Sequence, residues 1–161
     1  MPIPEFLAKL RARVGNELMV LPSVAACVFD EHGRMLMALH AEAEPLWAPP
    51  GGIVEPDESP ADAVVREVRE EIGLDIRVHD LIGVYGGPEF RVVYPNGDQC
   101  SYVISIYGCT VVRGAPRPDG VEISEVRWVA EAELPRLAKP RWTPVALPDC
   151  YAWWRRSFGA F

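Results

Sequence analysis

The sequence predicts an α+β protein, an α/β/α sandwich in which a mixed β-sheet is flanked by helices. Strand-like apolar runs lie before and after one well-delimited helix, at residues 60–72, and turn-forming clusters separate the runs. A hydrophobic fraction of 49% and a charged fraction of 24% are ordinary for a globular protein. The 161 residues suit one domain of common size, so we expect a single domain over residues 1–161, with short helical extensions at its N- and C-terminal ends.

The first part of the chain predicts a helix, a β-hairpin and a shaped loop. Apolar residues at helical spacing, followed by Gly15, predict a short amphipathic helix over residues 4–14. Two apolar runs, 24–29 and 35–39, are separated by a polar connection that suits a hairpin. Two prolines and two glycines within residues 46–52 predict a rigid loop without regular structure.

The helix at residues 60–72 has the clearest local signals. Ser59 is a good N-cap, Pro60 suits the first helical position, and Gly73 stands where helices commonly end. One stripe of this helix is apolar and is expected to pack, while the other side presents carboxylates. The apolar stripe comprises Ala61, Val64, Val65, Val68 and Ile72, and the other side carries Arg66, Glu67, Glu70 and Glu71.

The chain after Gly73 is rich in strands. Asn96-Gly97, flanked by strand-forming residues, predicts a hairpin. Short helices are expected over residues 131–137 and 149–157. The expected strands cover residues 76–85, 90–94, 102–112 and 126–129.

Charge and composition exclude several classes of protein. A net charge of −7 argues against a protein that wraps a nucleic-acid backbone, because such binding depends on clustered Lys and Arg. No apolar run approaches the length of a membrane span, and no targeting signal is visible, so a cytoplasmic location is expected. The scattered cysteines predict buried, reduced thiols without a zinc site. They are Cys27, Cys100, Cys109 and Cys150.

Three glutamates on the 60–72 helix are the first candidates for chemistry. Glu67, Glu70 and Glu71 stand at i, i+3 and i+4, which places them on one side of the helix within reach of a common point. The triplet alone fits two interpretations. One is a solvated acidic face, and the other is a site for a hard cation, which prefers oxygen ligands.

The residues around the triplet favour the cation site. From Gly52 onward the chain fits the pattern G-x5-E-x7-R-E-U-x-E-E-x-G-U, where U is aliphatic, and every defined position is satisfied. The positions are Gly52, Glu58, Arg66, Glu67, Val68, Glu70, Glu71, Gly73 and Leu74. This segment resembles the Nudix box, and with the preceding Trp47 to Gly51 and the strand pattern the resemblance extends over residues 23–137.

The resemblance implies a Nudix fold and metal-dependent hydrolysis of a diphosphate (pyrophosphate) linkage in a nucleoside diphosphate derivative. Mg²⁺ (or Mn²⁺) is the implied cofactor, because a divalent ion neutralises the diphosphate and activates water. The implied catalytic residues are Glu67, which is also a candidate general base, Glu70 and Arg66. The implied metal ligands are Glu67, Glu70, Glu71, a carbonyl of Gly51 or Gly52, and Glu122, with Glu125 as its substitute. The implied structural supports are Gly52, Glu58 and Gly73, and Glu58 and Arg66 would brace the loop onto the helix.

The Nudix box specifies the reaction and leaves the substrate open. A small nucleotide is expected, with ADP-ribose or another nucleotide sugar first, because Pro88 lies close to the position of a proline that marks ADP-ribose pyrophosphatases in the family. The alternatives are a nucleoside triphosphate or modified nucleotide, an RNA 5′ end, and a non-catalytic nucleotide sensor. The aromatic tail through Phe161 is a candidate homodimer interface. Candidates to stack on a base, with packing as the alternative, are Trp47, Tyr85, Phe90, Tyr94 and Trp142.

Overall fold

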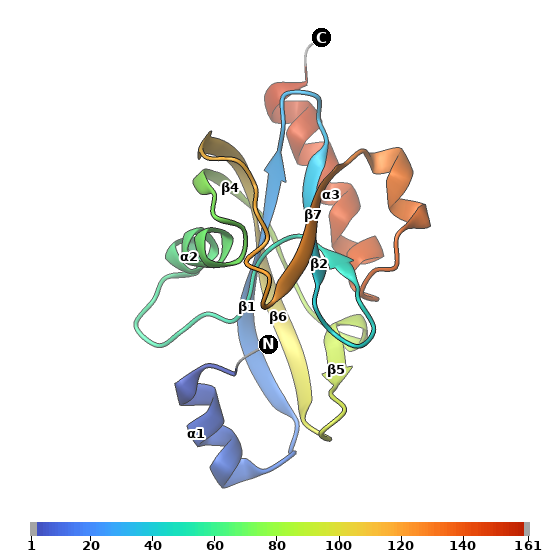
Figure 1. Ribbon diagram of the computed structural model, residues 1–161. Helices are drawn as coiled ribbons and strands as arrows, with labels where there is room; N and C mark the ends of the chain where they lie inside the picture. Colours follow the sequence, from blue (N-terminus) through green and yellow to red (C-terminus); the bar gives the residue numbers. More distant parts are fainter. Residues whose placement is uncertain (1–2, 160–161) are drawn as a thin grey trace.

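The computed structural model of the protein describes residues 3–159, and Figure 1 shows its helices and strands. The strands are β1 (Met19–Phe29), β2 (Met35–His40), β3 (Trp47–Ala48), β4 (Asp75–Tyr85), β5 (Arg91–Val93), β6 (Gln99–Arg113) and β7 (Ile123–Val129). The helices are α1 (Glu5–Val14), α2 (Pro60–Ile72) and α3 (Thr143–Phe158), with 3₁₀ turns η1 (Pro88–Phe90) and η2 (Glu131–Arg136). Residues 160–161, which end the aromatic tail expected at an interface, lie outside the described residues.

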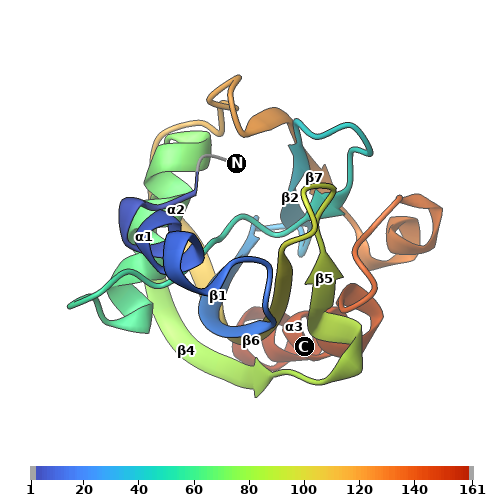
Figure 2. The same ribbon diagram turned by 90° about the horizontal axis from the view of Figure 1, so that it is seen from below.

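All seven strands belong to one mixed sheet. Its main path is β3-β2-β1-β6-β4, while β5 pairs with β6 and β7 pairs with β2. The long strands β1 and β6 run parallel, from Met19↔Cys100 to Phe29↔Thr110, and the other pairs are antiparallel. Helices α2 and α3 lie on opposite sides of β1 and β6 (Figure 2). The predicted mixed sheet flanked by helices is therefore confirmed.

From Ser23 to Phe29, strand β1 is buried on both faces, which explains the nearly continuous apolar sequence of this part of the strand. Alternate side chains point to opposite sides of a strand. Val24, Ala26 and Val28 pack in the core beneath α2, whereas Ala25, Cys27 and Phe29 pack in the core beneath α3. The sheet therefore joins two apolar layers and provides a rigid support for α2.

Helix α2 begins and ends where the sequence predicts. The Ser59 hydroxyl accepts a hydrogen bond from the Asp62 N–H at 3.2 Å, and Gly73 ends the helix with a φ of 67°. The predicted division of its faces is wrong at Glu71, which is only 2% exposed and lies with the buried residues. The buried residues of α2 are Ala63, Val64, Val68, Glu71 and Ile72.

Two other predictions of local structure need correction. Residues 47–48 were expected in an irregular loop, but Trp47 and Ala48 form β3 by pairing with Leu39 and Ala38 of β2. Helix α3 begins at Thr143 instead of residue 149, because Pro144 occupies the first turn, where the missing N–H has no intrahelical partner to lose. The remaining elements differ from the predicted ranges mainly by longer strand ends.

Helix α1 packs against the end of the sheet where β1 and β6 begin, at the bottom of Figure 1. Leu7 is buried among Leu21, Ile53 and Cys100. All four cysteines are free and buried, as predicted. Within residues 3–159, every helix is too short or too polar to traverse a lipid bilayer.

Candidate active site

The loop before α2 is held against β1 by backbone hydrogen bonds. The Val24 N–H donates to the Gly52 carbonyl at 2.9 Å, and the Ala26 N–H donates to the Pro50 carbonyl at 2.8 Å. On the other side of the loop, the Gly51 N–H donates to Oε2 of Glu71 at 3.0 Å. The loop therefore lies directly between the sheet and the carboxylates of α2.

This loop approaches its neighbours too closely for side chains. A Cβ on Gly51 would lie 2.1 Å from the carbonyl oxygen of Val24. A Cβ on Gly52 would lie 2.4 Å from Oε1 of Glu67. The first neighbour is fixed backbone, whereas the second is the end of a side chain that can move.

We expect alanine at these two glycines to have different consequences. Gly51→Ala should lower the free energy of unfolding by about 2–3 kcal/mol, because the sheet backbone must shift. Gly52→Ala should cost less stability but lower kcat by about 10- to 100-fold, because it displaces Glu67. Urea unfolding and initial rates of hydrolysis measure the two effects. Equal losses of stability in both variants would contradict this assignment.

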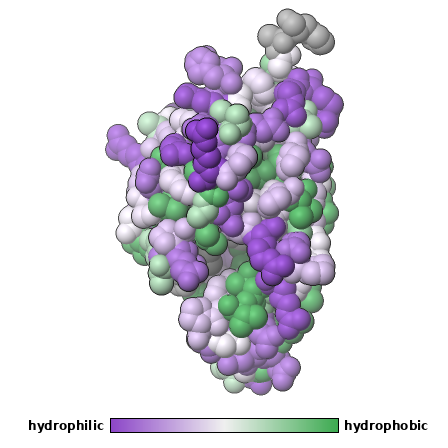
Figure 3. All heavy atoms as spheres, turned by 90° about the vertical axis from the view of Figure 1, so that its right-hand side faces the viewer, coloured by the Kyte–Doolittle hydropathy of each residue, from purple (hydrophilic) through white to green (hydrophobic). Residues whose placement is uncertain are grey.

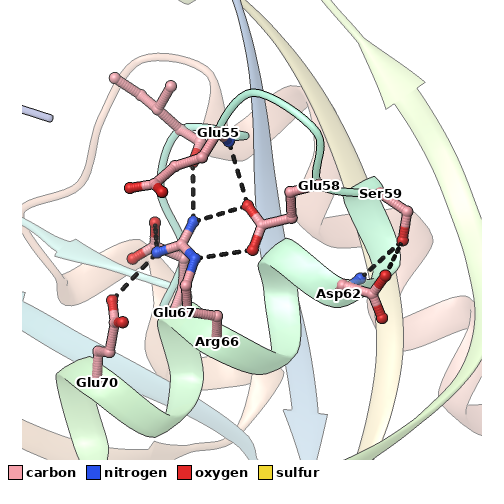
Figure 4. Close-up of polar contacts among 8 residues, drawn as sticks. Glu55, Glu58, Ser59, Asp62, Arg66, Glu67 and Glu70 are labelled. Atoms are coloured by element: carbon pink, nitrogen blue, oxygen red, sulfur yellow. Dashed lines mark hydrogen bonds and ion pairs between the residues drawn. The ribbon is translucent and has the colours of Figure 1, made fainter. Parts of the chain in front are cut away.

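Arg66 connects the loop to the glutamates of α2, as Figure 4 shows. Its guanidinium binds Glu58 through two hydrogen bonds, of 2.8 and 3.0 Å, and donates to the Ile53 carbonyl at 3.2 Å. Nη1 donates to Oε1 of Glu67 at 2.9 Å and to Oε2 of Glu70 at 3.1 Å. The bidentate pair with Glu58 holds the Arg66 guanidinium in one orientation as well as pairing its charge.

The carboxylates around Arg66 have different electrostatic environments. Hydrogen bonds from Arg66 lower the pKa of Glu58. Burial raises the pKa of Glu67, although Arg66 opposes this shift. Burial also raises the pKa of Glu122, and the nearby charges of Asp119 and Glu70 act in the same direction. The site therefore concentrates negative charge that Arg66 offsets only in part.

Glu71 is the most deeply buried of these carboxylates. Burial, reinforced by the charge of Glu67, raises the pKa of Glu71 to about 8. Its Oε2 accepts the Gly51 hydrogen bond, but Oε1 has no hydrogen-bond partner among the described residues. A buried, unpartnered carboxylate oxygen is costly unless a proton or a cation neutralises it. An oxygen-rich site of this charge fits a hard divalent ion.

Glu122 reaches the site from the loop before β7. The Asp119 carboxylate accepts hydrogen bonds from the N–H groups of Glu122 and Ile123, at 3.0 and 2.8 Å, and so shapes the turn. Glu125, its predicted substitute, is exposed on β7 opposite Leu39. The role of Asp119 was missed by the sequence analysis, although an Asp that begins a tight Asp-Gly turn is a recognisable signal.

One cavity of about 260 Å³, here called the acidic cavity, collects most of the predicted site. Glu67, Glu70 and Glu122 line it together with Arg66 and Gly52. Glu71 is not in its wall, so the three glutamates of α2 do not share one cavity. Within residues 3–159, the carboxylates are not already arranged as a metal cluster, since Arg66 binds Glu67 and Glu70 while Gly51 binds Glu71.

A second cavity of about 230 Å³, here called the aromatic cavity, meets the first at Gly52 and Ile53. Of the five aromatic candidates, Tyr94 and Trp142 line it, and the others contribute to core packing. The buried hydroxyl of Ser23 is also in its wall and has no hydrogen-bond partner among the described residues. The face that carries β5 and η2, shown in Figure 3, has apolar surface next to a hollow among hydrophilic residues.

The glutamates of α2, held by Arg66 and by the glycine loop on a mixed sheet, form the arrangement that the resemblance to the Nudix box implies for a hydrolase of phosphoric anhydride bonds. The chain belongs to the NUDIX domain family, whose profile matches residues 19–150. It is a Nudix pyrophosphohydrolase.

Three known proteins illustrate the similarity. An ADP-ribose pyrophosphatase of Methanocaldococcus jannaschii is 33% identical over 120 residues, which are 73% of this chain and 67% of that protein. A Bacillus subtilis protein provisionally named an 8-oxo-dGTP diphosphatase is 34% identical over 113 residues, 70% of this chain and 68% of that protein. The crystal structure of an ADP-ribose pyrophosphatase from Streptococcus suis superimposes with a TM-score of 0.65 at 25% identity, over 84% of this chain and 92% of that one.

Proposed function

We propose that the chain hydrolyses the diphosphate linkage of a nucleoside diphosphate sugar, with Mg²⁺ (or Mn²⁺) held by Glu67, Glu70, Glu71, Glu122 and the Gly51 carbonyl. The observation that carries the metal site is the buried Glu71 Oε1, which has no hydrogen-bond partner among the described residues. The Gly52 carbonyl already accepts from Val24, which favours Gly51 as the backbone ligand.

The side chains of the acidic cavity have distinct parts in the proposed reaction. When bound, the divalent ion neutralises the diphosphate oxygens and lowers the pKa of water. Glu67 accepts the proton of the attacking water. Burial raises the pKa of this carboxylate toward neutral pH, which suits a general base. Arg66 and Glu58 keep the Glu67 carboxylate oriented. Water adds to one phosphorus, the bond to the bridging oxygen breaks, and two phosphate monoesters leave.

The aromatic cavity supports a nucleoside as one part of the substrate. The rings of Tyr94 and Trp142 offer apolar surface to a base, and the free hydroxyl of Ser23 offers a hydrogen bond. Trp142 is held by stacking on Phe90, at 6.1 Å between ring centroids, in the short turn that begins at Pro88. The two relatives named ADP-ribose pyrophosphatases support a nucleotide sugar. The alternative is a modified triphosphate, supported by the name of the Bacillus relative.

A substrate panel tests this proposal. Purified protein with Mg²⁺ is expected to hydrolyse ADP-ribose or another nucleotide sugar with a higher kcat/KM than canonical triphosphates, oxidised triphosphates or dinucleoside polyphosphates. Reaction in ¹⁸O-labelled water identifies the attacked phosphorus from the product that gains the label. Preferential hydrolysis of an oxidised triphosphate would support the alternative, and no turnover of any compound would favour a ligand sensor.

A further inference from the structure

Helix α1 precedes residue 19, where the family match begins, and the two residues just before the helix, Ile3 and Pro4, line the acidic cavity. A cavity of about 300 Å³ lies between α1 and the β5–β6 hairpin, and we call it the α1 cavity. Leu7 and Arg11 form one wall, and Tyr94, Asp98 and Tyr102 form the other. This space therefore depends on a part of the chain outside the matched domain.

The α1 cavity lies next to the other two cavities and shares lining residues with each of them. Ile53 lines all three of them. Ile3 and Pro4 line both the α1 cavity and the acidic cavity, while Tyr94 and Tyr102 line both the α1 cavity and the aromatic cavity. A diphosphate in the acidic cavity would thus have two spaces beside it, one for a group on each phosphorus.

Arg11 fixes α1 in this position. Its guanidinium donates to the backbone carbonyls of Glu17 and Gln99, both at 2.7 Å, and its Nε lies 3.7 Å from the Asp98 carboxylate. The Arg11 side chain is only 9% exposed. The wall is therefore formed before any ligand arrives, and binding does not have to order it.

The lining of the α1 cavity suits a hydroxyl-bearing group better than a phosphate. The hydroxyls of Tyr94 and Tyr102 form a hydrogen bond of 2.6 Å, which offers a polar pair beside apolar ring faces. Asp98 and Glu42 add carboxylates. Among residues 3–159, Arg11 is the one cation in the lining, and it is already bound to carbonyls and close to Asp98. Carboxylates accept hydrogen bonds from sugar hydroxyls and repel a terminal phosphate.

We propose that the α1 cavity receives the sugar carried on the far side of the diphosphate, so that α1 selects substrates with an organic group on each phosphorus over nucleoside triphosphates. This inference rests on the proposed function. It extends that function by assigning substrate selection to Leu7, Asp98 and the two tyrosines.

The test fills the cavity from α1. Leu7→Trp places a larger side chain toward the space, and the matched control Leu10→Trp adds the same ring to the exposed face of the helix, where Leu10 is 41% exposed. We expect Leu7→Trp to raise KM for ADP-ribose and UDP-glucose by about tenfold or more, with kcat/KM for ATP within about twofold of wild type. Leu10→Trp should match wild type with all three compounds.

A binding measurement accompanies the kinetics. Calorimetric titration of the metal-free full chain with ADP-ribose and with AMP should show a weaker Kd for ADP-ribose alone in Leu7→Trp. If Leu7→Trp does not fold, as judged by circular dichroism, the isosteric Asp98→Asn replaces it. That variant should raise the ratio of kcat/KM for ATP to that for ADP-ribose by about fivefold, because it removes a repulsive charge.

The outcomes separate the inference from the proposed function. An equal effect of Leu7→Trp on ADP-ribose and AMP binding, or on the kinetics of sugar nucleotides and ATP, would overturn the role of α1. Unchanged values for ADP-ribose would do the same. Absence of hydrolysis by the wild-type chain would reject the proposed function, and the calorimetric comparison would still decide whether α1 borders a sugar site.

Discussion

Replacement of Glu70 by glutamine is expected to lower kcat by about three orders of magnitude, because loss of a ligand to the ion removes several kcal/mol of transition-state stabilisation. The free energy of unfolding should change by less than about 0.5 kcal/mol. The Glu70 side chain is 61% exposed, and its ion pair is with Arg66 at 3.1 Å. Steady-state kinetics at saturating Mg²⁺ and urea unfolding measure the two quantities.

A matched control separates this effect from a general change of charge. Glu44→Gln removes an exposed glutamate from the loop between β2 and β3 and should leave kcat within about twofold of wild type. If both variants kept the kcat of wild type, the assignment of Glu70 as a metal ligand would be wrong.

Replacement of Glu71 by glutamine is expected to stabilise the metal-free protein at alkaline pH and to abolish its stabilisation by Mg²⁺. The pKa of Glu71 is raised by burial to about 8 from an ordinary value of 4.5. Between these values the folded protein holds a proton that the unfolded chain has released, so the free energy of unfolding of wild type falls as pH rises from about 4.5 through 8. A glutamine side chain does not ionise in this range, so the variant lacks this contribution to the decrease in the free energy of unfolding.

The expected difference between the two proteins is on the order of 2–4 kcal/mol at pH 9, and it should vanish or reverse at pH 5. Urea unfolding at both pH values, with EDTA, measures it. Added Mg²⁺ should stabilise wild type at pH 9 through preferential binding to the folded state, and the variant should not respond. If the free energies of unfolding of wild type and variant changed in parallel with pH, ionisation of buried Glu71 would not be the cause of the destabilisation.

Local signals in the sequence were sufficient for α2 and the first hairpin. Ser59 and Gly73 act through hydrogen bonds within a few residues, and Pro60 acts through its fixed φ, so their effects can be predicted without knowing the fold. The parallel pairing of β1 with β6 could not be predicted in this way, since many sheet orders satisfy the same apolar runs. The same reason explains why β3 was not predicted, since Trp47 and Ala48 form a strand only because β2 lies beside them.

The motif named residues of which several line the acidic cavity, but its spacing did not show how deeply each is buried. Helical periodicity placed Glu71 near Glu67 and Glu70, while the Gly51 loop that packs on Glu71 is determined by its hydrogen bonds to β1. Asp119 was missed even though its contacts with Glu122 and Ile123 are local, because its place beside α2 depends on the hydrogen bond from its N–H to the Glu71 carbonyl. Long-range contacts of this kind leave no fixed spacing in a sequence.

The parallel pairing of β1 and β6 has a consequence for synthesis of the protein. Met19 pairs with Cys100, so a ribosome must synthesise the whole stretch from β1 to β6 before the centre of the sheet can close. Until then β1 has no partner strand on the edge that β6 later occupies. Nascent chains stalled before residue 99 are therefore expected to require chaperones. The glutamates on α2 leave the ribosome well before Glu122, so the lining of the acidic cavity is completed only after β6 has been synthesised.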